Sequence, residues 1–271
     1  MKEILNIVLC QCGVQWESPL ENMTRLHRFI SGYLTGCRED MRPDLIVLPE
    51  FFTTGFTSNT AFAETEDGPA LKWMRSLAVS SRSAVTGSVP ASSGGRVYNR
   101  MYMVLPDGRT EHYDKRHLFR MSGENDVFTP GNSPKVVSYL GWRIGLNVCY
   151  DLRFPVWTRR TPLNDYDLML NVASWPSSRV GAASVLACAR AVENQCWFAF
   201  CNRVGNSPED SYSGNSPIID YKGRSVGIFH EDGLTGSGGG FLSAALDIRE
   251  LRRFREKFPA WMDADNFGLL P

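Results

Sequence analysis

The chain has 271 residues, and 43% of them are apolar, an ordinary share for a globular protein. Lysine plus arginine and aspartate plus glutamate number 29 each, so no basic field covers the molecule. This balance argues against nucleic acid or an anionic membrane as a partner, and no apolar stretch approaches the ~18 residues that cross a membrane. We therefore expect a small-molecule partner and, because the composition shows no break, one domain over residues 1–271.

Seven cysteines are spaced irregularly along the chain: Cys10, Cys12, Cys37, Cys149, Cys188, Cys196 and Cys201. An odd number without a regular pattern does not indicate a disulfide framework. Most of them lie in apolar runs, where thiols pack as small hydrophobic groups. Residues 4–10 are predicted to be a first strand and not a signal peptide, because Glu3 stands where a signal peptide carries positive charge. We expect a reducing, cytoplasmic location.

The first half of the chain alternates apolar strands with amphipathic helices. Ser18 and Pro19 are typical of a helix start, with a capping serine and a proline in the first turn, and Gly36 ends the helical spacing. Expected helices are residues 19–36 and 69–81, and expected strands are residues 4–10, 44–48, 84–91, 97–105 and 110–115.

The second half of the chain combines hairpins with two further helices. Expected strands are residues 135–139, 142–149, 168–173, 197–203, 217–220, 224–229 and 241–247, and expected helices are residues 180–195 and 248–257. Helices that alternate with strand pairs indicate an α/β fold in which helices cover each sheet on one side. Two long loops, residues 51–67 and 116–133, are expected to be functional, as long loops in compact domains usually are.

Three reactive side chains stand at the ends of apolar strands: Glu50, Lys115 and Cys149. Strand ends are rigid supports, and a shared sheet edge would let the three groups converge. An amide carbon is a poor electrophile, for which a cysteine thiolate is a suitable nucleophile. A carboxylate can take the thiol proton and later protonate departing ammonia. A lysine ammonium can stabilise the oxyanion, with the backbone N–H of Tyr150 as a second donor.

Each of these residues also has a simpler interpretation. Glu50 and Lys115 could be solvated charges, and Cys149 could be one more buried thiol; the three together favour catalysis. His117 with Cys149 would suggest a cysteine–histidine protease, but the lysine and the glutamate explain the site without it. The histidine and cysteine spacings match no zinc site. Residues 202–203 are expected to serve local structure.

Three segments resemble the signature sequences of the nitrilase, or carbon–nitrogen hydrolase, superfamily: residues 48–50, 113–119 and 148–155. The order glutamate, lysine, cysteine matches that family as well, and the resemblance covers essentially the whole chain. It implies a four-layer α-β-β-α sandwich. It also implies a homodimer, with the helical region after Cys149 and the C-terminal tail near the interface.

The resemblance further implies the roles of the site residues. Glu50 would be the general base, Lys115 the oxyanion cation and Cys149 the nucleophile, with no metal and no organic cofactor. A supporting glutamate follows the lysine in many members of the family. Glu124 matches it here, and Asp126 is the alternative.

Residues 114–121 and 255–261 resemble bacterial members of the ω-amidase branch of this family. Those enzymes release ammonia from the terminal amide of 2-oxoglutaramate or 2-oxosuccinamate, substrates that carry a carboxylate at the far end. Arg153, four residues after the cysteine, suits a bidentate carboxylate clamp. The expected apolar walls of the pocket are Phe119, Tyr150 and Trp175.

The sequence leaves several alternatives open. Arg153 could pair with Asp151 instead of a substrate, and Trp175 could be a core residue. The same machinery could hydrolyse a nitrile, an N-carbamoyl amino acid or deaminated glutathione. A non-enzymatic binding protein on the same fold is the remaining alternative, against which the presence of all three catalytic side chains argues.

Overall fold

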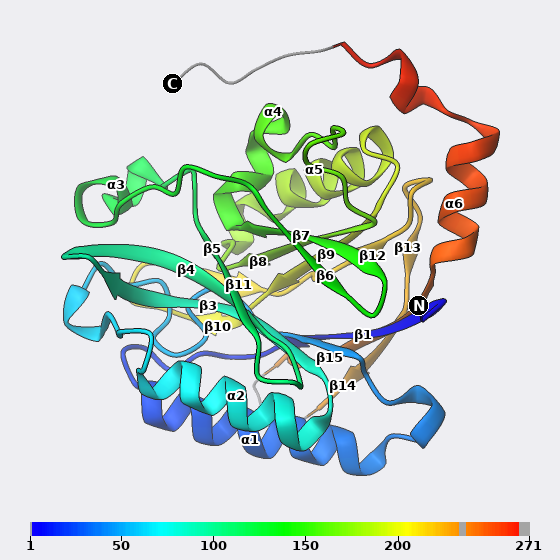
Figure 1. Ribbon diagram of the computed structural model, residues 1–271. Helices are drawn as coiled ribbons and strands as arrows, with labels where there is room; N and C mark the ends of the chain where they lie inside the picture. Colours follow the sequence, from blue (N-terminus) through cyan, green and yellow to red (C-terminus); the bar gives the residue numbers. More distant parts are fainter. Residues whose placement is uncertain (1, 233–236, 266–271) are drawn as a thin grey trace.

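The computed structural model contains two β-sheets packed face to face, with helices on both outer faces (Figure 1). It describes residues 2–232 and 237–265. One sheet contains β1 (Ile4–Gln11), β2 (Leu45–Val47), β3 (Ala84–Ser93), β4 (Arg96–Val104), β5 (Thr110–Asp114), β14 (Ile228–Glu231) and β15 (Gly240–Asp247). The other contains β6 (Lys135–Tyr139), β7 (Trp142–Val148), β8 (Leu168–Ala173), β9 (Trp197–Asn202), β12 (Ile218–Ile219) and β13 (Ser225–Val226).

Helices and one small ribbon complete the fold. The helices are α1 (Pro19–Gly36), α2 (Pro69–Ser81), α3 (Glu124–Val127), α4 (Pro155–Thr158), α5 (Val180–Glu193) and α6 (Ile248–Lys257). The ribbon pairs β10 (Val204–Asn206) with β11 (Ser211–Ser213). None of the helices in the described part of the chain is long and apolar enough to cross a membrane.

Each sheet is built around three parallel strands. The first has the order β14-β15-β1-β2-β3-β4-β5, in which β1, β2 and β3 are parallel. The second has the order β13-β12-β9-β8-β7-β6, in which β7, β8 and β9 are parallel. Parallel neighbours need crossover connections, and the four connections contain α1, α2, α4 and α5. Parallel strands of one sheet end at the same edge, so the residues that follow β7 and β8 lie together. The residues that follow β2 meet them from the other sheet, since the backbone N–H of Ser174 donates to Glu50.

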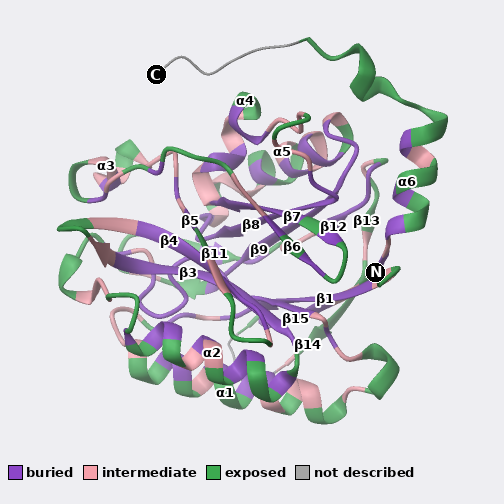
Figure 2. Cartoon of the chain, viewed as in Figure 1, coloured by how far each residue is buried: buried purple, intermediate pink, exposed green. Residues whose placement is uncertain are grey.

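Three hydrophobic clusters fill the layers (Figure 2). The largest lies between the sheets and includes Val47 and Leu170. A second cluster joins α1 and α2 to the outer face of the first sheet through residues such as Phe29. A third joins α5 to the second sheet through small side chains such as Ala187. The layers therefore run helix, sheet, sheet, helix, which confirms the predicted four-layer α-β-β-α sandwich.

The capping role predicted for Ser18 is wrong. Ser18 precedes α1, but its side chain makes no capping hydrogen bond. The hydroxyl instead donates to the carbonyl oxygen of Trp16 at 3.0 Å. The helix starts at Pro19, whose fixed φ and missing N–H suit the first turn.

The predicted single strand over residues 224–229 is also wrong. It is divided into β13 and β14, which belong to different sheets. Gly227 lies between them with φ 103°, and a Cβ there would stand 2.7 Å from the carbonyl oxygen of Ser243. Only glycine fits this crossing between sheets. The short β10–β11 ribbon was not predicted at all.

Candidate active site

A lysine ammonium and two carboxylates form the buried floor of the site. The Nζ atom of Lys115 lies 2.9 Å from Oε1 of Glu50 and 2.9 Å from Oε2 of Glu124. All three side chains are at most 1% exposed. Glu50 follows β2, Lys115 follows β5, and Glu124 begins α3. The structure thus brings together three of the predicted catalytic residues, while Asp126 is exposed outside this cluster.

Neutral donors fix the two carboxylates. The side-chain amide of Asn99 on β4 donates to Oε1 of Glu50 at 2.8 Å and to Oε1 of Glu124 at 3.0 Å. The backbone N–H of Ser174, next to β8, donates to the other oxygen of Glu50 at 2.8 Å. The backbone N–H of Phe119 donates to Oε2 of Glu124 at 2.6 Å. Both carboxylates are therefore held in one orientation, as buried charges require.

Cys149 lies where β7 ends and a 3-10 turn over Cys149–Arg153 begins. Its φ is 44°, in the left-handed region that residues with side chains rarely adopt. Asp151 supports the turn, since its carboxylate accepts from the backbone N–H of Val148 at 3.1 Å and from the hydroxyl of Tyr113 at 2.8 Å. The turn presents the partly buried Cys149 to a pocket that Lys115 also lines.

Burial and the charges of the floor together determine the protonation of the site. Burial and the neighbouring Glu50 raise the pKa of the Cys149 thiol well above its ordinary value, against the opposing effect of Lys115. Burial opposes the charged form of Lys115, but Glu124 and then Glu50 outweigh it and raise the pKa of the ammonium. Burial raises the pKa of Glu124, although Lys115 acts in the opposite direction. The resting site therefore holds a neutral thiol beside a charged lysine, and the thiol needs a base in order to attack.

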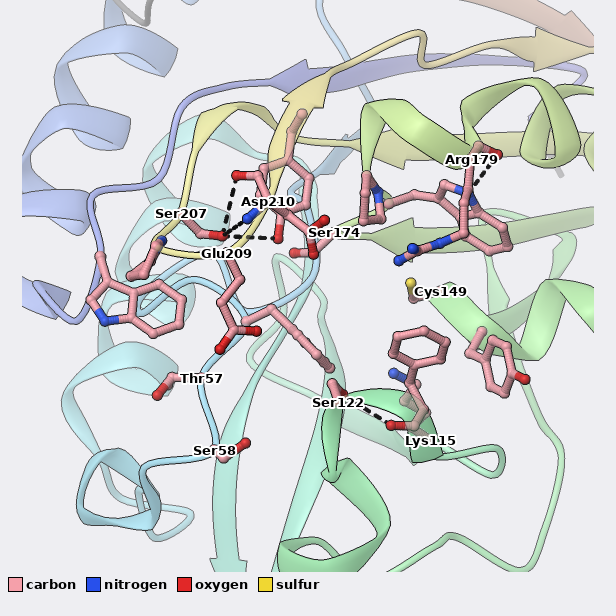
Figure 3. Close-up of a pocket in the computed structure, with 18 of the residues that line it drawn as sticks. Thr57, Ser58, Lys115, Ser122, Cys149, Ser174, Arg179, Ser207, Glu209 and Asp210 are labelled. Carbon is pink, nitrogen blue, oxygen red and sulfur yellow. Dashed lines mark hydrogen bonds between the residues drawn. The ribbon is translucent and has the colours of Figure 1, made fainter.

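The floor opens into a pocket of about 300 Å³ (Figure 3). All four residues predicted to contact the substrate line it: Phe119, Tyr150, Arg153 and Trp175. Phe119 and Tyr150 meet edge to face, with ring centroids 5.0 Å apart. Trp175 was expected to be either a pocket wall or a core residue, and it is both, since it is only 3% exposed and yet lines the pocket.

Arg153 faces the pocket without an acid partner. Its Cζ atom lies 5.0 Å from the ring centroid of Trp175, an arrangement typical of a cation–π contact. The alternative pairing with Asp151 does not occur, because Tyr113 and the imidazole of His117 occupy that carboxylate. No carboxylate in the described residues forms an ion pair with this arginine. Its guanidinium is available to a ligand.

A second arginine, Arg179, was missed in the sequence. It lines the same pocket, and its Cζ atom lies 5.3 Å from the ring centroid of Phe119 (Figure 3). No carboxylate in the described ranges pairs with it either. A signal did exist, because Arg179 closes the turn that follows β8, beside the end of β7. The rule that identified Cys149 at a strand end applies to this turn as well.

Residues from three loops make the far wall of the pocket: Trp16, Phe56, Thr57, Ser58, Asn59, Ser207, Pro208, Glu209, Asp210 and Tyr212. Figure 3 shows Ser207, Glu209 and Asp210 across the pocket from Cys149. We call this group the far wall. The length of the loop over residues 51–67 marked four of them as part of a functional loop, but no sequence pattern marked the others, because loops are placed by tertiary contacts and not by periodicity.

His117 lies outside the pocket lining. Its ring is stacked on Phe154 with centroids 3.7 Å apart, and its Nδ1 atom lies 2.8 Å from Oδ1 of Asp151. These contacts give His117 a supporting place beside the turn of Cys149. The cysteine–histidine protease alternative therefore has no geometric support.

The comparison with known proteins supports the resemblance seen in the sequence. The carbon–nitrogen hydrolase family matches residues 7–256. The omega-amidase YafV of Yersinia enterocolitica is 44% identical over 267 residues, which cover 98% of this chain and 99% of that protein. The 2-oxoglutaramate amidase of Bacillus subtilis is 32% identical over 257 residues, which cover 93% of this chain and 95% of that protein.

A solved structure is similar over the same extent. It is a CN-hydrolase superfamily protein from Xanthomonas campestris with an arsenic adduct in its active site, 37% identical in sequence. The TM-score is 0.88, and the match covers 99% of this chain and 100% of that one. Fold, site and relatives together define an enzyme that hydrolyses carbon–nitrogen bonds other than peptide bonds. The chain belongs to the carbon–nitrogen hydrolase family.

Proposed function

We propose that this enzyme is an ω-amidase, which hydrolyses the terminal amide of a 2-oxo dicarboxylic acid monoamide such as 2-oxoglutaramate or 2-oxosuccinamate. One observation carries the proposal: Arg153 and Arg179 line the pocket of Cys149, and neither has a carboxylate partner in the described residues. Guanidinium groups bind carboxylates through paired, charge-assisted hydrogen bonds. The relatives named omega-amidase and 2-oxoglutaramate amidase support the same substrate class.

The proposed mechanism uses the floor residues in turn. The sulfur of Cys149 attacks the amide carbon while Glu50 takes the thiol proton. Lys115 and the backbone N–H of Tyr150 stabilise the resulting oxyanion. The C–N bond breaks, Glu50 returns its proton to the leaving nitrogen, and ammonia departs from a thioester on Cys149. Glu50 then takes a proton from water, whose oxygen attacks the thioester. The C–S bond breaks, the acid departs, and Glu50 returns the proton to the sulfur of Cys149.

Glu124 has a supporting part in this proposal. It binds the ammonium of Lys115 through both carboxylate oxygens, at 3.0 and 2.9 Å. It therefore holds the lysine in place while Glu50 changes its protonation state. The exposed position of Asp126 makes Glu124 the better choice for this role.

Ammonia release tests the proposal directly. The enzyme is given 2-oxoglutaramate, a simple nitrile and an N-carbamoyl amino acid at equal concentrations, and kcat/KM is compared. We expect the 2-oxo acid amide to be preferred and the Cys149→Ala variant to be inactive. Preference for the nitrile or the carbamoyl compound would mean that the substrate belongs to that class and is not a 2-oxo acid amide. Normal turnover by Cys149→Ala would exclude the mechanism. No turnover of any amide would favour a binding protein on this fold.

We also propose that the enzyme is a cytoplasmic homodimer. Exposed apolar side chains gather around α4, α5 and the segment after α6: Val156, Val185, Val192, Phe258, Trp261 and Met262. That segment contacts this region, since the amide of Gln195 donates to the carbonyl oxygen of Phe258. Residues 266–271 of the tail lie outside the described residues. Light scattering that gives the mass of one chain would contradict the dimer.

A further inference from the structure

Arg203 is a buried cation that the proposed mechanism does not use. It directly follows β9, and its side chain is 0% exposed. No carboxylate in the part of the chain that the structure describes pairs with it, and its Cζ atom lies 4.4 Å from the ring centroid of Tyr212. Removing a guanidinium from water without an acid partner is costly. The contacts that compensate this cost therefore indicate what the residue does.

The guanidinium joins two loops that line the pocket. Its Nη2 atom donates to the carbonyl oxygen of Val14 at 2.7 Å and to that of Asn206 at 3.1 Å. Val14 lies two residues before Trp16, and Asn206 directly precedes Ser207. Both Trp16 and Ser207 belong to the far wall.

A third loop lies against the other terminal nitrogen of the guanidinium, Nη1. A Cβ at Gly55 would stand 3.1 Å from Nη1 of Arg203 and 3.3 Å from Cε3 of Trp16. Nη1 itself has no hydrogen-bond partner among the residues that the structure describes. Gly55 directly precedes Phe56, the far-wall residue of this third loop. One planar group is thus packed among all three loops that make the far wall.

We propose that Arg203 is a positioning residue for the far wall, and that it determines how tightly the enzyme binds the part of a substrate beyond the amide group. The proposal rests on the proposed amidase activity. The planar guanidinium places Nη2 on two carbonyl groups while its face lies on the ring of Tyr212 and Nη1 reaches Gly55, and the compact, strongly hydrated ammonium of lysine does not have this shape. The floor does not depend on it, because Glu50, Lys115 and Glu124 hold one another.

The test compares Arg203→Met and Arg203→Lys with the wild type. Small displacements of positioning groups can have large effects, and we expect the KM for 2-oxoglutaramate to rise about tenfold in both variants. We expect kcat to stay within about twofold, because the reacting groups are unmoved. The rate at which iodoacetamide alkylates Cys149, a readout of the floor alone, should equal that of the wild type. The control is Arg224→Met, which removes a surface arginine paired with Asp220 and should change none of these values.

Each other outcome overturns the proposal. An unchanged KM would leave Arg203 without a role in binding. A lower kcat and a slower alkylation of Cys149, together with a higher KM, would indicate general damage to the fold. A wild-type KM in the Arg203→Lys variant would assign the effect to the positive charge and not to the planar shape of the guanidinium.

A second variant covers the case in which Arg203→Met does not fold. Gly55→Ala keeps the arginine but puts a Cβ against both Nη1 and Trp16, at a backbone position with φ 74°, and so disturbs the place where the three loops meet. It should raise KM in the same direction without changing the alkylation rate. An unchanged KM in a folded Gly55→Ala protein would also overturn the proposal. Wild-type turnover tests the proposed function separately; if another amide is the substrate, the variants are compared on that amide.

Discussion

The floor of the pocket and its far wall are held in opposite ways. On the floor, Lys115, Glu50 and Glu124 bind one another directly, and backbone groups or Asn99 complete their hydrogen bonds. The far wall contains no cluster of charges of this kind among the described residues; hydrogen bonds such as that from the N–H of Asp210 to the hydroxyl of Ser207 hold its loops locally, and all three loops meet around the guanidinium of Arg203. Reaction chemistry is thus supported by the rigid sheets, and contact with the substrate by loops. Variants in the two regions should therefore affect different kinetic constants.

The largest effect is expected for Lys115→Met on the floor. The change leaves two carboxylates buried without a cation, which should lower the free energy of unfolding by about 3–5 kcal/mol. Loss of the oxyanion cation should lower kcat by at least about 10²-fold. Urea denaturation and ammonia release measure the two effects.

Lys135→Met is the matched control for this prediction. Lys135 forms an ion pair with Glu111, and both side chains are more than one third exposed, at 35% and 39%. Such a surface pair contributes about 0–1 kcal/mol. If the two variants were equally stable, the floor would not be the tightly held region described above.

The same contrast explains how much of the site the sequence could predict. Glu50 and Cys149 follow apolar strands, and Lys115 follows the more polar strand β5. All three strands were predicted to within a residue or two, and the sheet geometry then brings their ends together. Glu124 begins a four-residue helix inside a long loop, so only the family resemblance identified it. The residues of the far wall had neither signal, and only the length of the loop over residues 51–67 indicated that part of it is functional.

The fold shows the same limit. The strands and helices of the two sheets were predicted because apolar runs and helical spacing are local properties of the sequence. The crossing at Gly227 was missed, because it depends on a positive φ and on the nearby carbonyl of Ser243. The ribbon β10–β11 was missed because each strand has only three residues, too few for a pattern.

A smaller effect, confined to KM, is expected for Arg153→Ala and Arg179→Ala. Hydrogen bonds to charged groups contribute about 1.5–3 kcal/mol, so each change should raise the KM for 2-oxoglutaramate roughly 10- to 100-fold. We expect kcat to change much less, because neither arginine touches the floor. Steady-state kinetics measure both constants, with the exposed Arg120→Ala as a control outside the pocket lining. A fall in kcat with unchanged KM would place these arginines with the floor.

The smallest effect is expected from pH in the range of about 8 to 9, where an ordinary thiol ionises. Burial and Glu50 raise the pKa of Cys149 above that range, so the thiol stays protonated throughout it. If Glu50 removes the proton during the attack, kcat/KM does not depend on a preformed thiolate and should remain nearly flat from pH 7 to 9. A rise of about tenfold per pH unit would mean that a preformed thiolate attacks, and Glu50 would lose its role as base. The Glu50→Gln variant sharpens the test: only a spontaneously ionised thiol can react there, so its residual activity should increase with pH while that of the wild type does not.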